Sequence, residues 1–340
     1  MERCKRFWQM YGRGEDLLLF EDEAEHMYTL PLAQAAAAFF SRHLLSEDRH
    51  IGLDGLVVEE GSEVWCTASG QVRGDFATNR GVYDENSSRL SLLEEERSRL
   101  PERTVQSRTA SWLREQVCNR RFVCELNPRH KKLGKWDGLD IQSSIWWSQP
   151  GLFSHGFLFS TTDSTCSELS IGIWEGGTTQ LQPCLDWIRG QISRGAAVLV
   201  LDLTGTGALS PNAINPKGLH DTFGTLHKLN MDLFWLGDSI AAIRVYDVLR
   251  ALVFARKLEN VDPDRISIYA KGRYSIYAEL ACAIESQYAS RLTVEEEWES
   301  VGSWVRSMFY ESKGISEFVL PGLLRLGDLP NLRRARHSGN

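Results

Sequence analysis

Residues 262–284, DPDRISIYAKGRYSIYAELACAI, combine a turn, a short strand, a second turn and a helix in one continuous stretch. The opening DPDR is typical of a turn, and the apolar ISIY at 266–269 predicts a short buried strand. A tight turn is expected at 270–274, followed by a helix over 275–284 with small residues on its packing side. A strand that leads through a tight turn directly into a helix indicates an α/β fold.

The tight turn consists of Ala270, Lys271, Gly272, Arg273 and Tyr274. In the G-x-S-x-G turn of α/β-hydrolases, the central serine is the nucleophile and is held exposed on a strained strand-to-helix bend. Gly272 stands at that central position and carries no nucleophilic atom. The flanking Lys271 and Arg273 could bind an anion at the start of the helix, or they simply face solvent. The stretch therefore has the architecture of an esterase elbow without its usual chemistry.

The composition is that of an ordinary globular chain and excludes several classes of function. The 340 residues are 42% hydrophobic and 24% charged, and their net charge of −7 gives no indication of a nucleic-acid partner. Seven scattered cysteines form no C-x-x-C pair and give no local ligand spacing for zinc. We expect no metal site, and we expect no cofactor. No apolar run reaches the ~18 residues of a membrane span, and no secretory signal is recognisable. We therefore expect a cytoplasmic protein without membrane contact, although export of a longer parent protein stays open.

The second half of the chain alternates between strand and helix patterns. Strands are predicted at 156–159, 169–174 and 197–203, and helices at 181–194 and 237–256. The clearest buried strand is the apolar AVLVLDL at 197–203. Strands that alternate with helices of this length predict an α/β, hydrolase-like fold with a mainly parallel sheet covered by helices.

The first half of the chain is less regular. The apolar run DLLLFE at 16–21 predicts a strand buried on both faces, and the alanine-rich segment 30–45 predicts a helix. A hairpin is expected around 64–72, before helices at 87–100 and 109–117. These patterns divide the chain into a closing strand and helix, a connector, and a hydrolase-like domain with a degenerate elbow, at 1–48, 49–139 and 140–340.

Four stretches, in this order, resemble the acetyl xylan esterase-like α/β-hydrolases, and in particular bacterial proteins that carry two such units in tandem. Residues 16–44 resemble the last strand, histidine loop and closing helix of a unit, and 64–84 resemble the segment that joins two units. Residues 196–207, AAVLVLDLTGTG, resemble the family's strand and D-x-R-G-x-G turn, with Thr204 in place of the arginine. Residues 238–284 resemble the helix and elbow. The resemblance covers most of the chain.

This resemblance implies that the chain combines the end of one hydrolase unit with most of a second. His26 falls at the family's catalytic histidine, which follows the elbow in a complete unit but precedes it here. The strand of the catalytic acid is expected beyond Asn340, so the fold is expected to be incomplete at its C-terminus. An upstream hydrolase unit is expected before Met1 as a partner. Either His26 is an exposed remnant, or its segment docks on the second sheet and brings it to the elbow.

The candidate catalytic residues are few. His26 is the candidate general base. Ser275 is a candidate nucleophile, although its place in the first helical turn after the elbow favours capping of the helix. Gly176 and Gly177 follow a strand at the place of the oxyanion-hole turn of esterases. Glu175 beside them would oppose a developing negative charge, so a plain strand-ending turn explains them equally well. Lys271, Gly272 and Arg273 complete the candidate site.

Three further polar residues receive structural interpretations. Asp202, at the end of the strand 197–203, is expected to hold the glycine turn at 205–207. His155 and His227 have no carboxylate near them in the sequence, and we interpret them as structural or surface groups.

Two functions are compatible with these residues, and whether the chain is an enzyme stays open. The resemblance implies a carboxylic ester hydrolase that acts on a small ester or an acetylated carbohydrate. That activity would need a partner polypeptide or an unrecognised nucleophile. The alternative is a non-catalytic hydrolase-like domain with a structural or ligand-binding role, which the missing serine favours.

Overall fold

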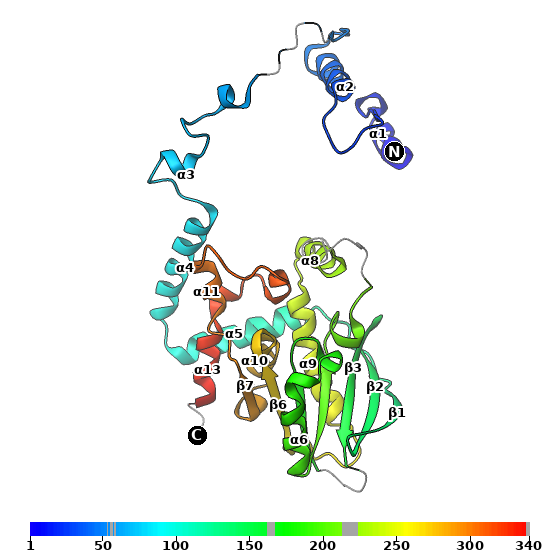
Figure 1. The fold of residues 1–340 in the computed structure, drawn as a ribbon, viewed down its shortest axis with the longest axis vertical. Coiled ribbons are helices and arrows are strands. Elements are labelled where there is room, and N and C mark those ends of the chain that lie inside the picture. The colour runs from blue at the N-terminus through cyan, green and yellow to red at the C-terminus, as the bar shows by residue number, and fades with distance from the viewer. Residues whose placement is uncertain (53, 55–56, 58, 162–166, 213–223, 338–340) are drawn as a thin grey trace. The chain divides into compact units, whose positions relative to one another are not determined.

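The computed structural model describes the chain except for residues 53, 55, 56, 58, 162–166, 213–223 and 338–340 (Figure 1). The chain forms two compact units, Met1–Asn79 and Arg80–Asn340. The boundary between the two units lies inside the segment 49–139 that the sequence predicts to be a connector.

A seven-stranded sheet forms the centre of the larger unit, with the strand order β1–β2–β3–β5–β4–β6–β7 (Figure 1). Strands β5, β4, β6 and β7 pair in parallel, whereas the pairs β1–β2, β2–β3 and β3–β5 are antiparallel. Two successive reversals give β2 the direction of the four parallel strands, so the predicted α/β fold with a mainly parallel sheet is confirmed. The strands are β1 (Arg129–Trp136), β2 (Leu139–Gln149), β3 (Leu152–Ser160), β4 (Glu168–Ile173), β5 (Ala196–Asp202), β6 (Ile266–Lys271) and β7 (Leu292–Glu295).

Helices cover both faces of the sheet because the central strands are apolar on both sides. On β5, Val198 and Val200 pack against α6 (Leu185–Ser193). The alternate residues Leu199 and Leu201 belong to the larger cluster on the opposite face, with α9 (Ile240–Ala255), α10 (Ser275–Ile284) and α5 (Glu102–Val117). A strand buried on both faces reads as a continuous apolar run, which is why the sequence predicts β5 correctly.

The predicted helices of the larger unit are present, with shifts of a few residues at their ends. The helix after the elbow has the predicted bounds, because Ser275 starts it and Ile284 ends it. The predicted helices 87–100 and 109–117 overlap α4 (Val82–Ser98) and the second half of α5, and both observed helices begin several residues earlier than predicted. The side chains of Leu113 and Val117 on α5 are completely buried. Further α-helices among the described residues of this unit are α8 (Thr225–Trp235), α11 (Val301–Arg306), α12 (Leu323–Leu326) and α13 (Leu329–His337).

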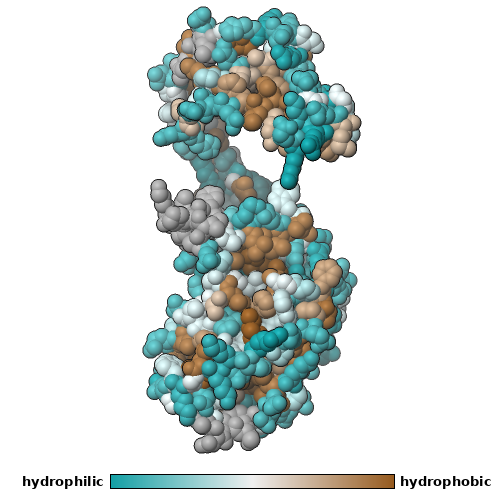
Figure 2. All heavy atoms as spheres, turned by 90° about the vertical axis from the view of Figure 1, so that its right-hand side faces the viewer, coloured by the Kyte–Doolittle hydropathy of each residue, from teal (hydrophilic) through white to brown (hydrophobic). Residues whose placement is uncertain are grey.

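The smaller unit contains α1 (Glu2–Met10), α2 (Leu30–Phe40), a π-helical turn at Ser41–Leu45 and α3 (Val72–Asp75). The helix predicted at 30–45 is therefore confirmed. The strand predicted at 16–21 is wrong, because Gly14–Asp16 is a short 3₁₀ helix and the next residues have no regular structure. No described residue of this unit forms a strand that could pair with them, and apolar side chains stay exposed on its surface (Figure 2).

The hairpin predicted around 64–72 is also wrong. A 3₁₀ helix at Gly61–Val64 and the short helix α3 occupy its place. That residues 1–48 derive from a hydrolase unit stays a prediction. None of the described helices combines the length and the apolar character that a membrane crossing requires.

Candidate functional site

The elbow predicted at 270–274 has the geometry of a strand–turn–helix bend. Strand β6 ends at Lys271, a 3₁₀ turn spans Gly272–Tyr274, and α10 begins at Ser275. Gly272 has φ +62°, and a Cβ atom built on it would have no heavy atom within 4 Å. The bend therefore has a left-handed backbone at Gly272 with open space beside it, and that it is a nucleophile elbow stays a prediction.

The turn after β4 lies beside the elbow and is held by Asp202. The N–H of Thr178 donates to Asp202 Oδ1 at 2.7 Å, and the N–H of Gly177 donates to the carbonyl of Trp174 at 3.2 Å. A Cβ atom on Gly177 would lie 2.1 Å from the same carboxylate oxygen. These two N–H groups of the predicted oxyanion turn are thus already bonded, and an oxyanion would compete with Asp202 for that of Thr178.

Asp202 holds the turn after β5 as well, as the sequence predicts. Its Oδ2 accepts from the N–H of Ala208 at 3.0 Å. A Cβ atom on Gly207, whose φ is +55°, would lie only 1.9 Å from Oδ1. One buried carboxylate therefore joins the two glycine turns that border the elbow.

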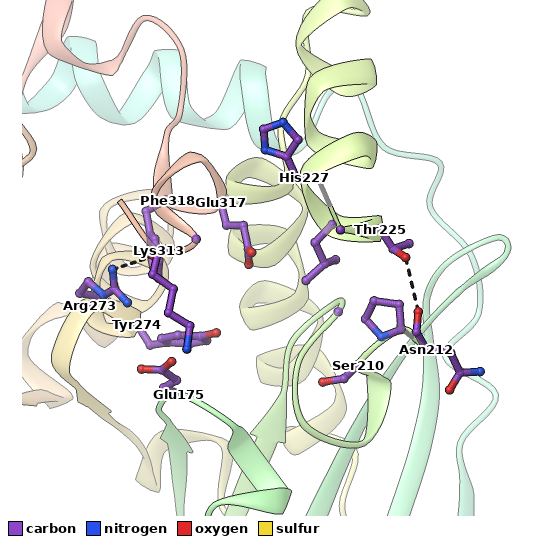
Figure 3. A pocket seen from close by; sticks show the side chains of 15 residues that line it. Glu175, Ser210, Asn212, Thr225, His227, Arg273, Tyr274, Lys313, Glu317 and Phe318 are labelled. Carbon is purple, nitrogen blue, oxygen red and sulfur yellow. Dashed lines mark hydrogen bonds between the residues drawn. The ribbon is translucent and has the colours of Figure 1, made fainter. Parts of the chain in front are cut away.

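Two adjoining cavities of about 400 and 620 Å³ open at the carboxyl ends of β4, β5 and β6. Open α/β sheets bind ligands at this edge. Figure 3 shows side chains from several elements around the first cavity, including Glu175, Arg273, Tyr274 and Lys313. The residues that line both cavities are Glu175, Gly205, Ser210, Leu226, Arg273, Tyr274 and Glu317.

A buried arginine supports one wall of these cavities. Arg244, on α9, is completely buried, and its Nη2 lies 2.7 Å from Glu317 Oε2. Its Nε donates to the carbonyl of Thr204 at 2.9 Å, and its Nη1 donates to the Tyr277 hydroxyl at 2.9 Å. Burial alone would lower the pKa of Arg244, but Tyr277 and Glu317 raise it overall, so the guanidinium stays charged. Burial raises the pKa of Tyr277 above its ordinary range.

The two cations that flank Gly272 differ in their surroundings. Lys271 Nζ lies 2.6 Å from Glu295 and 3.1 Å from Glu296, and these partners raise its pKa. Arg273 donates to the carbonyl of Lys313 at 3.1 Å and lies over the ring of Phe318, 5.1 Å from its centre. The Lys271 charge is thus neutralised by carboxylates, whereas the charge of Arg273 faces a carbonyl, an aromatic ring and the cavity.

Ser275 and His26 are not brought to this cavity by any described contact. Ser275 is completely buried, and its hydroxyl donates to Glu279 Oε1 at 3.2 Å inside the core. His26 is exposed in the smaller unit, which is a separate compact body. The role of His26 as a general base and that of Ser275 as a nucleophile therefore stay predictions.

The sequence does not predict the contacts that several residues make in this region. His155, interpreted as a structural or surface group, has a carboxylate partner after all, because its Nδ1 lies 2.7 Å from Asp202 Oδ2. Arg244 and Glu317 also form a pair that the sequence does not indicate. The signal that could have found Arg244 is its position, together with Asp247 and Arg250, inside the mainly apolar helix at 237–256, since charged residues are seldom buried without a partner.

The mainly parallel mixed sheet with helices on both faces has an α/β-hydrolase fold, and the resemblance to the acetyl xylan esterase-like hydrolases is borne out at the level of the fold. A protein of Bacteroides fragilis NCTC 9343 that has been assigned as an acetyl xylan esterase has a similar structure, with a TM-score of 0.56 at 11% sequence identity. The match covers 69% of this chain and 66% of that protein, slightly less than two thirds of its length.

An acetyl xylan esterase from Paenibacillus sp. R4 is more distant, with a TM-score of 0.35 at 20% identity over 55% of this chain and 62% of that chain. Acetyl Xylan Esterase 1 from Thermoanaerobacterium sp. JW/SL YS485 has a TM-score of 0.36 at 11% identity over 54% and 55%. No protein-family model and no curated protein matches the chain.

Proposed function

We propose that the larger unit is a ligand-binding domain of the α/β-hydrolase fold whose elbow cavity binds a small molecule and performs no covalent catalysis at Gly272. One observation carries this proposal. The elbow keeps its left-handed backbone and the open space in front of it, but Gly272 offers no nucleophilic atom to that space. A cavity is present beside Gly272, but Gly272 carries no nucleophile, and this combination supports ligand binding without hydrolysis.

The lining of the cavity favours a polar ligand with an acyl group. Arg273 and Lys313 supply donors, Glu175 supplies an acceptor, and Tyr274 and Phe318 supply aromatic surface. Such a mixture of rings and hydrogen-bonding groups suits a small ester or an acetylated carbohydrate. The name of the Bacteroides fragilis protein, acetyl xylan esterase, agrees with this choice of ligand.

Isothermal titration with acetylated xylo-oligosaccharides tests the proposal. We expect saturable binding to the wild type and binding at least tenfold weaker for Arg273→Ala, because one charge-assisted contact is lost. Arg99→Ala is the matched control, since Arg99 forms only an exposed ion pair with Glu95 on α4 and should bind like the wild type. Equal affinity of Arg273→Ala and the wild type would contradict the assignment of this cavity.

The second candidate is ester hydrolysis at the elbow with His26 as general base, and the elbow backbone of Gly272 favours it. Its test is the hydrolysis of p-nitrophenyl acetate by the wild type, His26→Ala and Gly272→Ser. Turnover that His26→Ala abolishes would support hydrolysis through His26. Equal rates of His26→Ala and the wild type would reject that role, whichever other residue turns the ester over.

A further inference from the structure

Three polar residues on neighbouring strands form a hydrogen-bonded chain outside the elbow. Ser143 lies on β2, His155 on β3 and Asp202 at the end of β5. Ser143 Oγ lies 2.9 Å from His155 Nε2, and His155 Nδ1 lies 2.7 Å from Asp202 Oδ2. Both distances fall in the range of a serine nucleophile, its base and the acid that orients the base.

The register of the sheet explains how these residues meet. His155 stands directly opposite Asp202 in the β3–β5 pair, while Ser143 stands opposite Phe157, two residues along β3 from His155. Residues two apart on a strand face the same side of the sheet, so the diagonal between Ser143 and His155 is within reach. The β2–β3 and β3–β5 pairings therefore bring the three side chains together, and no local sequence motif does.

The carboxylate fixes the direction of the hydrogen bonds. Asp202 is completely buried and also receives the N–H and hydroxyl of Thr178, at 2.7 and 2.5 Å, and the N–H of Ala208. A carboxylate only accepts, so His155 Nδ1 carries the proton that faces it. In the neutral ring, Nε2 then holds a lone pair toward Ser143, whose hydroxyl is the donor. This is the tautomer that a general base for serine requires.

The hydroxyl of Ser143 lies on a part of the sheet that is only half covered. Ser143 and its neighbours Ile145 and Phe157 are all half-buried, whereas the acid beneath them is not exposed at all. Figure 1 shows α6 in front of the middle of the sheet, with β1 and β2 beyond it at the edge. Lys131 stands opposite Ser143 on β1 and is exposed, which places a positive charge on the same face.

We propose that Ser143 is a second, functional nucleophile that accepts the acyl group of small carboxylic esters, with His155 as general base and Asp202 as the positioning acid. Ser143 Oγ attacks the ester carbonyl carbon while its proton moves to His155 Nε2. The C–O bond to the alcohol breaks, and the leaving alkoxide takes that proton, which leaves an acyl ester on Ser143. Water, deprotonated by His155, then attacks the acyl ester, and a carboxylic acid and free Ser143 are released.

The molecule contains a matched control for this chemistry. The next residue, Ser144, is completely buried and pairs with His130 Nδ1 at 2.9 Å, where the other described contact of that ring nitrogen is the Gln142 amide. Ser144 therefore has a histidine, but its described contacts show no carboxylate that orients the ring. Because Ser144 is buried and its histidine contacts no described carboxylate, Ser144→Ala should leave the reactivity of Ser143 unchanged.

The test is covalent labelling with a small fluorophosphonate, followed by peptide mapping. We expect one phosphonyl group on Ser143 of the wild type, at least tenfold less labelling in Ser143→Ala and His155→Gln, and unchanged labelling in Ser144→Ala. Steady-state hydrolysis of p-nitrophenyl acetate should fall by at least tenfold in the same two variants. Circular dichroism checks that each variant is folded, and mapping of the wild type alone decides the labelled residue if a variant does not fold.

The proposal is overturned if the wild type takes up no label, if the label maps to another residue, or if Ser143→Ala is labelled like the wild type. It is independent of the elbow cavity, because Ser143 is not among the residues that line it. Ser143→Ala should bind acetylated xylo-oligosaccharides like the wild type, and Arg273→Ala should be labelled normally. Failure of one proposal is therefore distinguishable from failure of the other.

Discussion

Glu317 and Arg244 form an ion pair in which the arginine is completely buried and the carboxylate side chain is 18% exposed. The pair joins the central helix α9 to the 3₁₀ helix Ile315–Phe318 at the rim of the elbow cavities. The arginine is supported from its other side by Tyr277 and the Thr204 carbonyl. Loss of the carboxylate would leave a charged guanidinium in the core whose remaining hydrogen-bond partners, the Thr204 carbonyl and the Tyr277 hydroxyl, are neutral.

Glu317→Gln should therefore be strongly destabilising. Removal of one partner of a buried pair leaves an uncompensated charge, and we expect a loss on the order of 3 kcal/mol in the free energy of unfolding, measured by urea denaturation. Glu95→Gln removes the carboxylate of an exposed pair with Arg99 and should cost less than about 0.5 kcal/mol. Equal stability of the two variants would show that Arg244 does not depend on Glu317.

Two glycines with similar backbone angles should respond very differently to alanine. Gly272 and Gly207 have φ +62° and +55°, so both variants carry the left-handed strain of about 1–2 kcal/mol. At Gly272 the new methyl group meets open space, but at Gly207 it would lie 1.9 Å from Asp202 Oδ1. We expect Gly207→Ala to lose about 2 kcal/mol more than Gly272→Ala in urea unfolding. Similar losses would mean that the Gly207 turn can move away from Asp202.

The sequence predicts the elements whose signal is local. Strand β5 and helix α10 are recognisable because continuous apolar residues or small packing residues mark them within a single stretch. Strand β1, RHKKLGKW, is exposed along its whole length and has no apolar alternation, so only its pairing with β2 makes it a strand. The run at 16–21 shows the opposite error, since its apolar residues lack a partner strand among the described residues of their unit.

The candidate site is predictable only in part, for the same reason. The sequence alone shows that Gly272 stands where a nucleophilic serine would be expected. The contact between His155 and Asp202 joins residues 47 positions apart and depends on the register of two antiparallel strands. A one-residue shift in that register would turn His155 to the other face of the sheet, so no local pattern could have revealed the pair.

Asp247 should make the stability of the chain depend on pH. It is completely buried on α9, and burial raises its pKa to about 6, although hydrogen bonds from Thr204 and the charge of Arg244 lower it. An acid whose pKa is raised on folding stabilises the protein below its unfolded value of about 3.9, and this contribution is lost as the pH rises through about 6. The difference between the pKa values of Asp247 in the folded and unfolded chains corresponds to about 3 kcal/mol of unfolding free energy.

Asp247→Asn removes this titration while its amide oxygen can still accept from the Thr204 N–H, which now donates at 2.8 Å. We expect the unfolding free energy of the variant, relative to the wild type, to rise between pH 4 and pH 7. Asp186→Asn changes a fully exposed aspartate and should follow the wild type across this range. A constant difference between Asp247→Asn and the wild type from pH 4 to pH 7 would contradict a raised pKa.

The cysteines should differ in reactivity according to their burial. Cys184 lies in the wall of the larger elbow cavity, is 2% exposed, and has its pKa raised by burial to about 11. Cys4 and Cys66 are exposed.

Because the thiolate is the reactive form, iodoacetamide at pH 7.5 should modify Cys4 and Cys66 at least tenfold faster than Cys184 in the folded chain. In denaturant all three should react at similar rates, which separates the effect of the fold from that of the local sequence. Peptide mapping after short exposure measures the rates, and modification of Cys184 as fast as Cys66 in the native protein would show that this wall opens to solvent.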